Sequence, residues 1–181
     1  YMWYLLENYD TNDEIAYLVN NLEMYFVPAV NPDGYEYNYQ QDPGGGGMWR
    51  KNMRDNNGGG FNEYYDGVDL NRNYGYNWGF DDVGSSPYGG DATYRGTGPF
   101  SEPQTQIIRD FTNDHEFLLA HNHHTYSNLI IIPWGYDEIH TPDDEFLRTS
   151  ANFMASKKES SSKPGCCYCF HRYRIHFHWL W

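Results

Sequence analysis

Cysteine is missing from residues 1–165, and long apolar runs are missing from the whole chain of 181 residues. The first absence excludes a disulfide framework for the body, because Cys166, Cys167 and Cys169 all lie close together near the C-terminus. The second absence excludes a membrane-spanning helix, which needs about 20 consecutive apolar residues. No secretory leader is recognisable, and the chain opens without Met in what we expect to be a helix, so we expect further chain before it.

Basic residues are scarce in the body of the chain. Residues 1–150 hold 24 Asp and Glu against 7 Lys and Arg, a net charge of −17. Phosphate recognition needs a basic footprint, so nucleic acid is excluded as a partner of this region. The hydrophobic fraction of 39% and the 18 tyrosines can still build one packed domain, although the mean hydropathy is −0.83.

The hydrophobic pattern alternates between helices and strands. Capping pairs, Thr11 with Glu14 and Ser101 with Gln104, mark two helix starts. The expected helices cover residues 2–8, about 12–20, 101–111 and 141–154, and the expected buried strands cover residues 24–30, 117–120 and 129–132. Such alternation predicts an α/β layered fold with a largely parallel or mixed sheet.

Residues 31–100 form a long segment rich in Gly, Asn, Asp and Tyr. Its first part, residues 30–37, contains Asn-Pro and Asp-Gly and predicts a turn. Loops of this total length are uncommon in compact domains and usually functional. The glycine runs at 44–47 and 58–60 are not followed by Lys-Ser/Thr or a helix pattern, so neither is a phosphate loop.

The tail, residues 157–181, differs from the body, residues 1–156. Residues 151–181 hold one acidic and five basic residues, and they contain every cysteine of the chain. A zinc knot, a hydrophobic docking element and a sequence unrelated to the domain remain open as explanations. We favour the unrelated end, because the Cys/His spacing matches no zinc ribbon.

Two cationic positions in the long segment are candidates for chemistry. Arg50 follows Trp49 and could rest on that ring at the surface, or point into a cleft and stabilise negative charge. Arg72, with Asn71 beside it, could clamp a carboxylate bidentately. In an acidic protein a loop Arg can equally pair with a nearby Asp, and both interpretations stay open.

Three histidines, His121, His123 and His124, follow the expected strand 117–120. Ligands in open α/β sheets bind at the carboxyl ends of strands. Alternation places Asn122 and His124 on one face and His121 and His123 on the other. A metal site and a polar strand end with hydrogen-bonded imidazoles both fit this pattern.

Taken together and in order, the motifs YFVPAVNPDGYEY, MWRKN, GVDLNRNYGYNWG, SSPYGGDATYRGTGPFSEPQTQ and HHTYSNLIIIPWGY make residues 1–154 resemble the zinc carboxypeptidases, in particular carboxypeptidases A and T. The resemblance implies a three-layer α/β/α fold with a mixed, mostly parallel central sheet. It implies an extracellular, monomeric hydrolase that uses one zinc ion and acts on peptide and protein C-termini.

The resemblance also implies roles for single residues. His124 would be a zinc ligand, and Arg50 would polarise the scissile carbonyl and steady the oxyanion. Asn71 and Arg72 would grip the terminal carboxylate of the substrate. Thr125 and Tyr126 would line the cleft, and cis peptide bonds are expected at Thr125–Tyr126 and Pro133–Trp134.

The chain departs from the family pattern in three respects. It contains no His-x-x-Glu motif, which supplies two zinc ligands in the family, and no segment that matches the one carrying the catalytic glutamate. His123 also stands where the family commonly has an apolar residue. We therefore expect this chain to be inactive by itself and poorly soluble. A non-enzymatic relative that binds C-terminal peptides and a non-functional truncated product are the alternatives.

Overall fold

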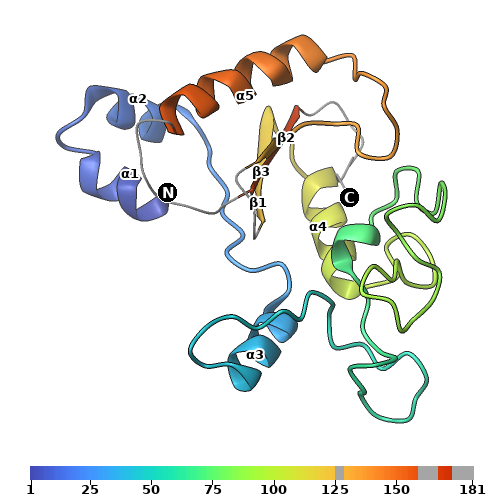
Figure 1. Ribbon diagram of the computed structural model, residues 1–181. Helices are drawn as coiled ribbons and strands as arrows, with labels where there is room; N and C mark the ends of the chain where they lie inside the picture. Colours follow the sequence, from blue (N-terminus) through green and yellow to red (C-terminus); the bar gives the residue numbers. More distant parts are fainter. Residues whose placement is uncertain (125–128, 159–166, 173–181) are drawn as a thin grey trace.

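The computed structural model describes residues 1–124, 129–158 and 167–172, with side chains described as far as residue 156 (Figure 1). Six helical elements are present in this part of the chain. They are α1 (Met2–Asn8), α2 (Asp13–Asn21), α3 (Pro32–Gln41), the 3-10 turn η1 (Leu70–Arg72), α4 (Pro103–Asn113) and α5 (Asp144–Lys158). None of the described helices is long and apolar enough to cross a membrane.

Three strands form one mixed sheet: β1 (Leu119–His124), β2 (Ile130–Ile131) and β3 (Cys167–Arg172). Their order is β1-β3-β2, with β3 antiparallel to β1 and parallel to β2. Helix α5 crosses beside this sheet and contacts β2 and β3 (Figure 1). The mixed character of the sheet agrees with the sequence, whereas a mostly parallel sheet and the three-layer arrangement stay predictions.

Part of the cysteine-containing tail lies inside the sheet. Its strand β3 pairs with β1 from Leu119 opposite Arg172 to His124 opposite Cys167. On its other side β3 pairs with Ile130 and Ile131 of β2. The tail therefore joins two strands of the body through backbone hydrogen bonds, while the division of the chain at residue 157 stays a prediction.

The first expected strand, residues 24–30, does not form within the described residues. This segment is extended but unpaired, and Tyr25 and Val27 are 40% and 49% exposed. Tyr25 packs edge-on against Phe111 and Phe117, with ring centroids 5.3 and 5.5 Å apart. The prediction of a strand buried on both faces was therefore wrong here, because an apolar run needs a partner strand before it becomes part of a sheet.

Helix α2 begins where it was expected, but its cap is a different residue. The side-chain oxygen of Asn12 accepts hydrogen bonds from the backbone N–H groups of Glu14 and Ile15, at 3.0 and 3.3 Å. Asn is at least as good an N-cap as the Thr11 that we predicted.

Residues 30–37 were expected to form a turn, and they form most of helix α3 instead. Asn31 caps the helix by accepting a hydrogen bond from Gly34 N–H at 3.1 Å, and Pro32 occupies the first turn. Asn-Pro serves a helix start as well as a turn, since Pro lacks only an N–H that has no partner in a first helical turn.

Helix α4 begins at Pro103, close to its expected start, but the expected capping box of Ser101 and Gln104 is absent. Its N-cap is Glu102, which makes no side-chain capping bond, and the Ser101 hydroxyl donates to Glu102 Oε1 at 2.7 Å. The Glu102 carboxylate is buried and binds Arg54 and Asn52 instead.

A buried asparagine organises the end of the long segment. The Asn73 amide donates to the carbonyls of Arg95 and Gly98, at 2.9 and 3.1 Å, and to the Ser101 hydroxyl. Its oxygen accepts from the backbone N–H of Glu102 and from the Thr105 hydroxyl. Because such satisfied polar networks fix geometry, residues 70–105 are held in place with little regular structure.

A second buried asparagine joins the start of the segment to its middle. The Asn52 amide donates to Glu102 Oε2 at 2.8 Å, and its oxygen accepts from Val68 N–H at 2.8 Å. The backbones of Asn52 and Val68 are also hydrogen bonded at 2.9 Å. These bonds place residue 50 close to residue 69, although the two lie far apart in the sequence.

Candidate active site

His124 is the last residue of β1 and is partly buried. Burial lowers the pKa of its imidazole first, and the positive charges of Arg72, Arg50 and His123 lower the pKa further. The two guanidinium groups therefore lie near this ring. The sequence placed this histidine at the carboxyl end of a strand, and His124 is the last residue of β1.

Alternation along β1 is as predicted. The rings of His121 and His123 pack together on the other face, with centroids 4.4 Å apart. Burial lowers the pKa of His121 to about 4, and the charge of His123 adds to this effect. His124 is thus separated from the other two histidines and faces the arginines.

Arg50 is held by a buried carboxylate. Its Nη2 lies 2.7 Å from Asp69 Oδ2, and the Arg50 side chain is 47% exposed while that of Asp69 is 3% exposed. Burial raises the pKa of Asp69, and the charges of Arg72 and Arg50 oppose that rise. Arg50 therefore has one face fixed to the protein and keeps the other toward solvent.

The neighbouring Lys51 explains why Arg50 points outward. Lys51 is buried, and its Nζ donates to the carbonyls of Gly89 and Asp91 at 2.8 and 3.3 Å. Burial lowers the pKa of Lys51, and the negative charges of nearby carboxylates oppose this effect. Since successive side chains of an extended segment point in opposite directions, anchoring Lys51 inward directs Arg50 outward.

Asn71 and Arg72 are placed by η1. Asp69 caps this turn by accepting a hydrogen bond from Asn71 N–H at 3.1 Å. Arg72 Nε donates to Gly84 O at 2.6 Å, and its Nη1 lies 3.4 Å from Asn71 O. Burial lowers the pKa of Arg72. The negative charge of Asp69 opposes this decrease, and the positive charge of Arg50 increases it.

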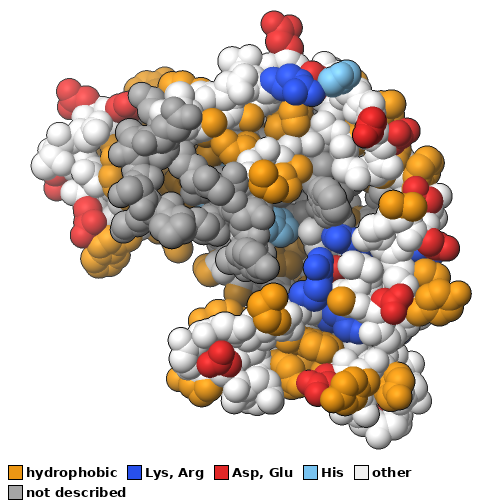
Figure 2. All heavy atoms as spheres, in the orientation of Figure 1, with side chains coloured by type: hydrophobic (Ala, Val, Ile, Leu, Met, Phe, Trp, Pro, Cys, Tyr) orange, Lys and Arg blue, Asp and Glu red, His pale blue; other side chains and the backbone are white. Residues whose placement is uncertain are grey.

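Lys and Arg side chains gather beside a histidine in the hollowed middle of the molecular surface (Figure 2). Around the end of β1, the buried Asp69 is the acid that both Arg50 and Arg72 face. One carboxylate facing two guanidinium groups leaves a local excess of positive charge. Such a site is suited to bind an anion, and planar guanidinium groups favour a carboxylate.

Two predicted cleft residues, Thr125 and Tyr126, lie outside the described residues, as does the peptide bond between them. The other expected cis bond, Pro133–Trp134, is present. The Trp134 ring stacks on Tyr76, with centroids 4.9 Å apart and an interplanar angle of 17°. This contact joins the segment after β2 to the loop that follows Arg72.

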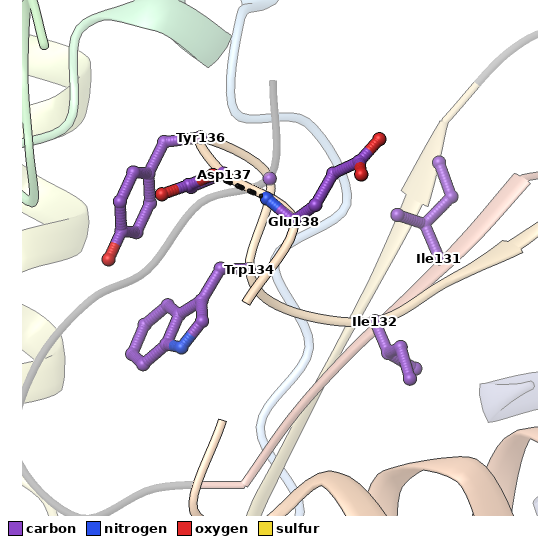
Figure 3. Close-up of a pocket in the computed structure, with 7 residues that line it drawn as sticks. Ile131, Ile132, Trp134, Tyr136, Asp137 and Glu138 are labelled. Atoms are coloured by element: carbon purple, nitrogen blue, oxygen red, sulfur yellow. Dashed lines mark hydrogen bonds between the residues drawn. The ribbon is translucent and has the colours of Figure 1, made fainter. Parts of the chain in front are cut away.

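A cavity of about 390 Å³ opens beside this aromatic contact (Figure 3). Its lining comes from Ile131 and Ile132 at the end of β2 and from Trp134, Gly135, Tyr136, Asp137 and Glu138. Of the predicted site residues that the structure describes, Arg50, Asn71, Arg72 and His124, none lines this cavity.

The described residues do not fit a zinc ion by themselves. No group of three or more His, Cys, Asp or Glu side chains placed to hold a metal occurs among them. A catalytic zinc needs three protein ligands and an open position, and of the predicted ligands only His124 is present. Zinc at this site would therefore need ligands beyond those that the structure describes.

Asp69 was not among the predicted site residues. It pairs with Arg50 and also caps the turn that carries Asn71 and Arg72. The sequence does contain a signal for this role. Asp69 stands two residues before Asn71, the spacing at which an Asp side chain caps a turn. The sequence leaves open that Arg72 pairs with a nearby Asp, whereas in the structure Asp69 forms its direct ion pair with Arg50.

Known proteins share sequence with this chain over most of its length. The family model described as zinc carboxypeptidase matches residues 1–176. Carboxypeptidase O of Bos taurus is 32% identical over 167 residues, covering 89% of this chain and 42% of that protein. Carboxypeptidase O of Homo sapiens is 36% identical over 134 residues, covering 73% of this chain and 33% of that protein.

Among solved structures, bovine thrombin-activatable fibrinolysis inhibitor in complex with tick carboxypeptidase inhibitor is similar, with a TM-score of 0.66 and 26% identity. The match covers 90% of this chain and 53% of that one. The chain thus spans less than half the length of the two carboxypeptidases O. With a family model matched over nearly its whole length, the chain belongs to the zinc carboxypeptidase family.

Proposed function

We propose that this chain forms the carboxylate-binding side of a carboxypeptidase cleft. The observation that supports this most strongly is the ion pair of Arg50 with Asp69, the same buried acid that caps the turn carrying Asn71 and Arg72. The family's reaction, removal of C-terminal residues from peptides and proteins, requires recognition of a free terminal carboxylate. An excess of guanidinium charge beside the end of β1 meets that requirement.

Arg72 and Asn71 bind the terminal carboxylate of the substrate in this proposal. Nε of Arg72 is already bonded to Gly84 O, which holds the guanidinium plane in a fixed direction. The side-chain amide of Asn71 makes no hydrogen bond to another described residue and is available as a second donor. A planar guanidinium and an amide together select a carboxylate over a neutral end.

Arg50 has a different role. Its ion pair with Asp69 fixes one edge of the guanidinium, and the half-exposed remainder points to solvent. A positive charge held in this way stabilises negative charge that develops on a substrate carbonyl. Thr125 and Tyr126 complete the wall of the cleft in our proposal.

Hydrolysis would need more than the described residues supply. The family reaction depends on zinc, for which this sequence provides His124 and no His-x-x-Glu motif. We therefore propose that the chain alone binds peptide C-termini without cleaving them. A protein that adds the missing ligands and a carboxylate base would be the active, extracellular and monomeric enzyme.

The recognition step is tested by titrating the chain with a blocked dipeptide and with its C-terminal amide. The free acid should bind at least tenfold more tightly than the amide, and Arg72→Ala should remove the difference. Arg148→Ala is the matched control, because Arg148 lies exposed on α5 and pairs with Asp144. Equal binding of acid and amide would reject the proposal.

The hydrolytic step needs a separate measurement. Release of C-terminal residues should be close to zero for this chain, with or without added zinc. Stoichiometric zinc together with turnover would show that the chain is a complete enzyme, against our proposal.

A further inference from the structure

Two histidines lie side by side on the face of β1 opposite His124. His121 and His123 are two positions apart on one strand, so their side chains share a face. Their ring centroids are 4.4 Å apart, at an interplanar angle of 54°. The Tyr1 ring contacts both, with centroid distances of 6.2 Å to His121 and 5.3 Å to His123. The proposed peptide cleft uses neither histidine.

The spacing of the two rings is that of a chelate. A metal–nitrogen bond of about 2.1 Å puts the metal about 3.2 Å from each ring centre. Bond angles of roughly 90° to 109° at the metal then give ring centres about 4.5 to 5.2 Å apart. The observed 4.4 Å lies just below this range, so the two rings are close enough to share one ion.

The chemical state of the rings also suits a metal. A ligating imidazole must be neutral, and burial keeps His121 neutral, with its pKa lowered to about 4. Two imidazole nitrogens favour late first-row divalent ions, among which Cu²⁺ binds most strongly. No third His, Cys, Asp or Glu completes a metal group among the described residues, so water would fill the remaining positions.

We propose that His121 and His123 form a two-histidine chelate for a divalent transition-metal ion, Cu²⁺ before Ni²⁺ and Zn²⁺, on the face of β1 away from the peptide cleft. The site does not depend on the proposed function, because His121 and His123 have no role in the proposed peptide cleft.

The test is Cu²⁺ titration of the full chain in a background that carries Cys166→Ser, Cys167→Ser and Cys169→Ser, which removes competing thiolates. Calorimetry should give one ion bound per chain, and electron paramagnetic resonance should show coupling to two nitrogens. His121→Leu and His123→Leu should each weaken binding at least tenfold. His124→Leu and His140→Leu, at the cleft and on the surface, should change the affinity less than twofold.

Circular dichroism establishes that each variant is folded, and His121→Asn and His123→Asn serve as polar replacements if the Leu variants unfold. Unchanged Cu²⁺ affinity in both the His121 and His123 variants would overturn the proposal. Loss of binding in His124→Leu would also overturn it, because the ion would then belong to the cleft. Loss of all binding on removal of the cysteines alone would place the ion in the tail and overturn it equally.

Discussion

Arg50 and Asp69 form an ion pair between two separate loop segments, with 2.7 Å between Arg50 Nη2 and Asp69 Oδ2. The same carboxylate caps the turn that carries Asn71 and Arg72. One buried acid thus positions all three residues that we assign to the substrate carboxylate and carbonyl. Changes at Asp69 should therefore separate its capping role from its charge.

Asp69→Ala should lower the free energy of unfolding by about 2 kcal/mol, because it removes the acceptor for Asn71 N–H as well as the ion pair. Asp69→Asn keeps an oxygen at the capping position and should cost about 1 kcal/mol or less, since Arg50 can turn to solvent. Urea denaturation of both variants at pH 7 measures the difference. Equal losses would show that the cap contributes nothing.

Replacement of two asparagines only two positions apart should change stability by very different amounts. Asn73→Ala leaves several buried donors and acceptors without a partner and should cost about 3 kcal/mol or more. Asn71→Ala should change stability by about 0.5 kcal/mol or less, because its side-chain amide bonds to no other described residue. Thermal unfolding of the pair is the measurement, and similar losses would contradict the polar-core account.

Two glycines with similar backbone angles provide a steric comparison. Gly67 has a φ of 80°, and a Cβ there would lie 2.6 Å from Asn52 O, whereas Gly58 has a φ of 77° and open space around it. Gly58→Ala should cost about 1 kcal/mol from the left-handed backbone alone, and Gly67→Ala about 3 kcal/mol or more. Denaturation midpoints that shift equally would mean that the loops around residues 52 and 67 are not closely packed.

Stability should depend on pH through His121. Its folded pKa of about 4 lies below its ordinary value of 6.5, so the unfolded chain binds the proton more tightly. The free energy of unfolding that the neutral His121 ring contributes at pH 7 is therefore lost as pH falls from about 6.5 toward 4. The loss should be about 1 to 2 kcal/mol, because the ring is partly exposed. His121→Asn should flatten the profile by that amount relative to the parent chain. A profile unaltered by His121→Asn would contradict the assigned burial.

Helices were more predictable than strands in this sequence. Capping residues and first-turn prolines are local signals, so α2, α4 and α5 begin within a few residues of their expected starts. Whether residues 24–30 join a sheet depends on partners elsewhere in the chain, which local patterns do not contain. For the same reason the pairing of residues 167–172 between β1 and β2 was not foreseen.

The candidate site was predictable as a set of residue types but not as a network. Arg50, Arg72 and His124 were candidates from their positions in a loop and at a strand end, and the resemblance to the zinc carboxypeptidases assigned their roles. The pairing of Arg50 with Asp69 depends on the buried Asn52 bonding to Val68, a contact across 16 positions. No local sequence pattern encodes such a contact, so the pairing of Arg50 with Asp69 becomes visible only in the fold.

The central claim is that Arg72 recognises a terminal carboxylate. A double-mutant cycle tests it most directly, with the peptide as free acid or amide and the protein either unchanged or carrying Arg72→Ala. Calorimetric titration of all four pairs should give a coupling free energy of about 2 kcal/mol, as for a hydrogen bond to a charged group. A coupling within error of zero would mean that the carboxylate does not contact Arg72, and would contradict the account.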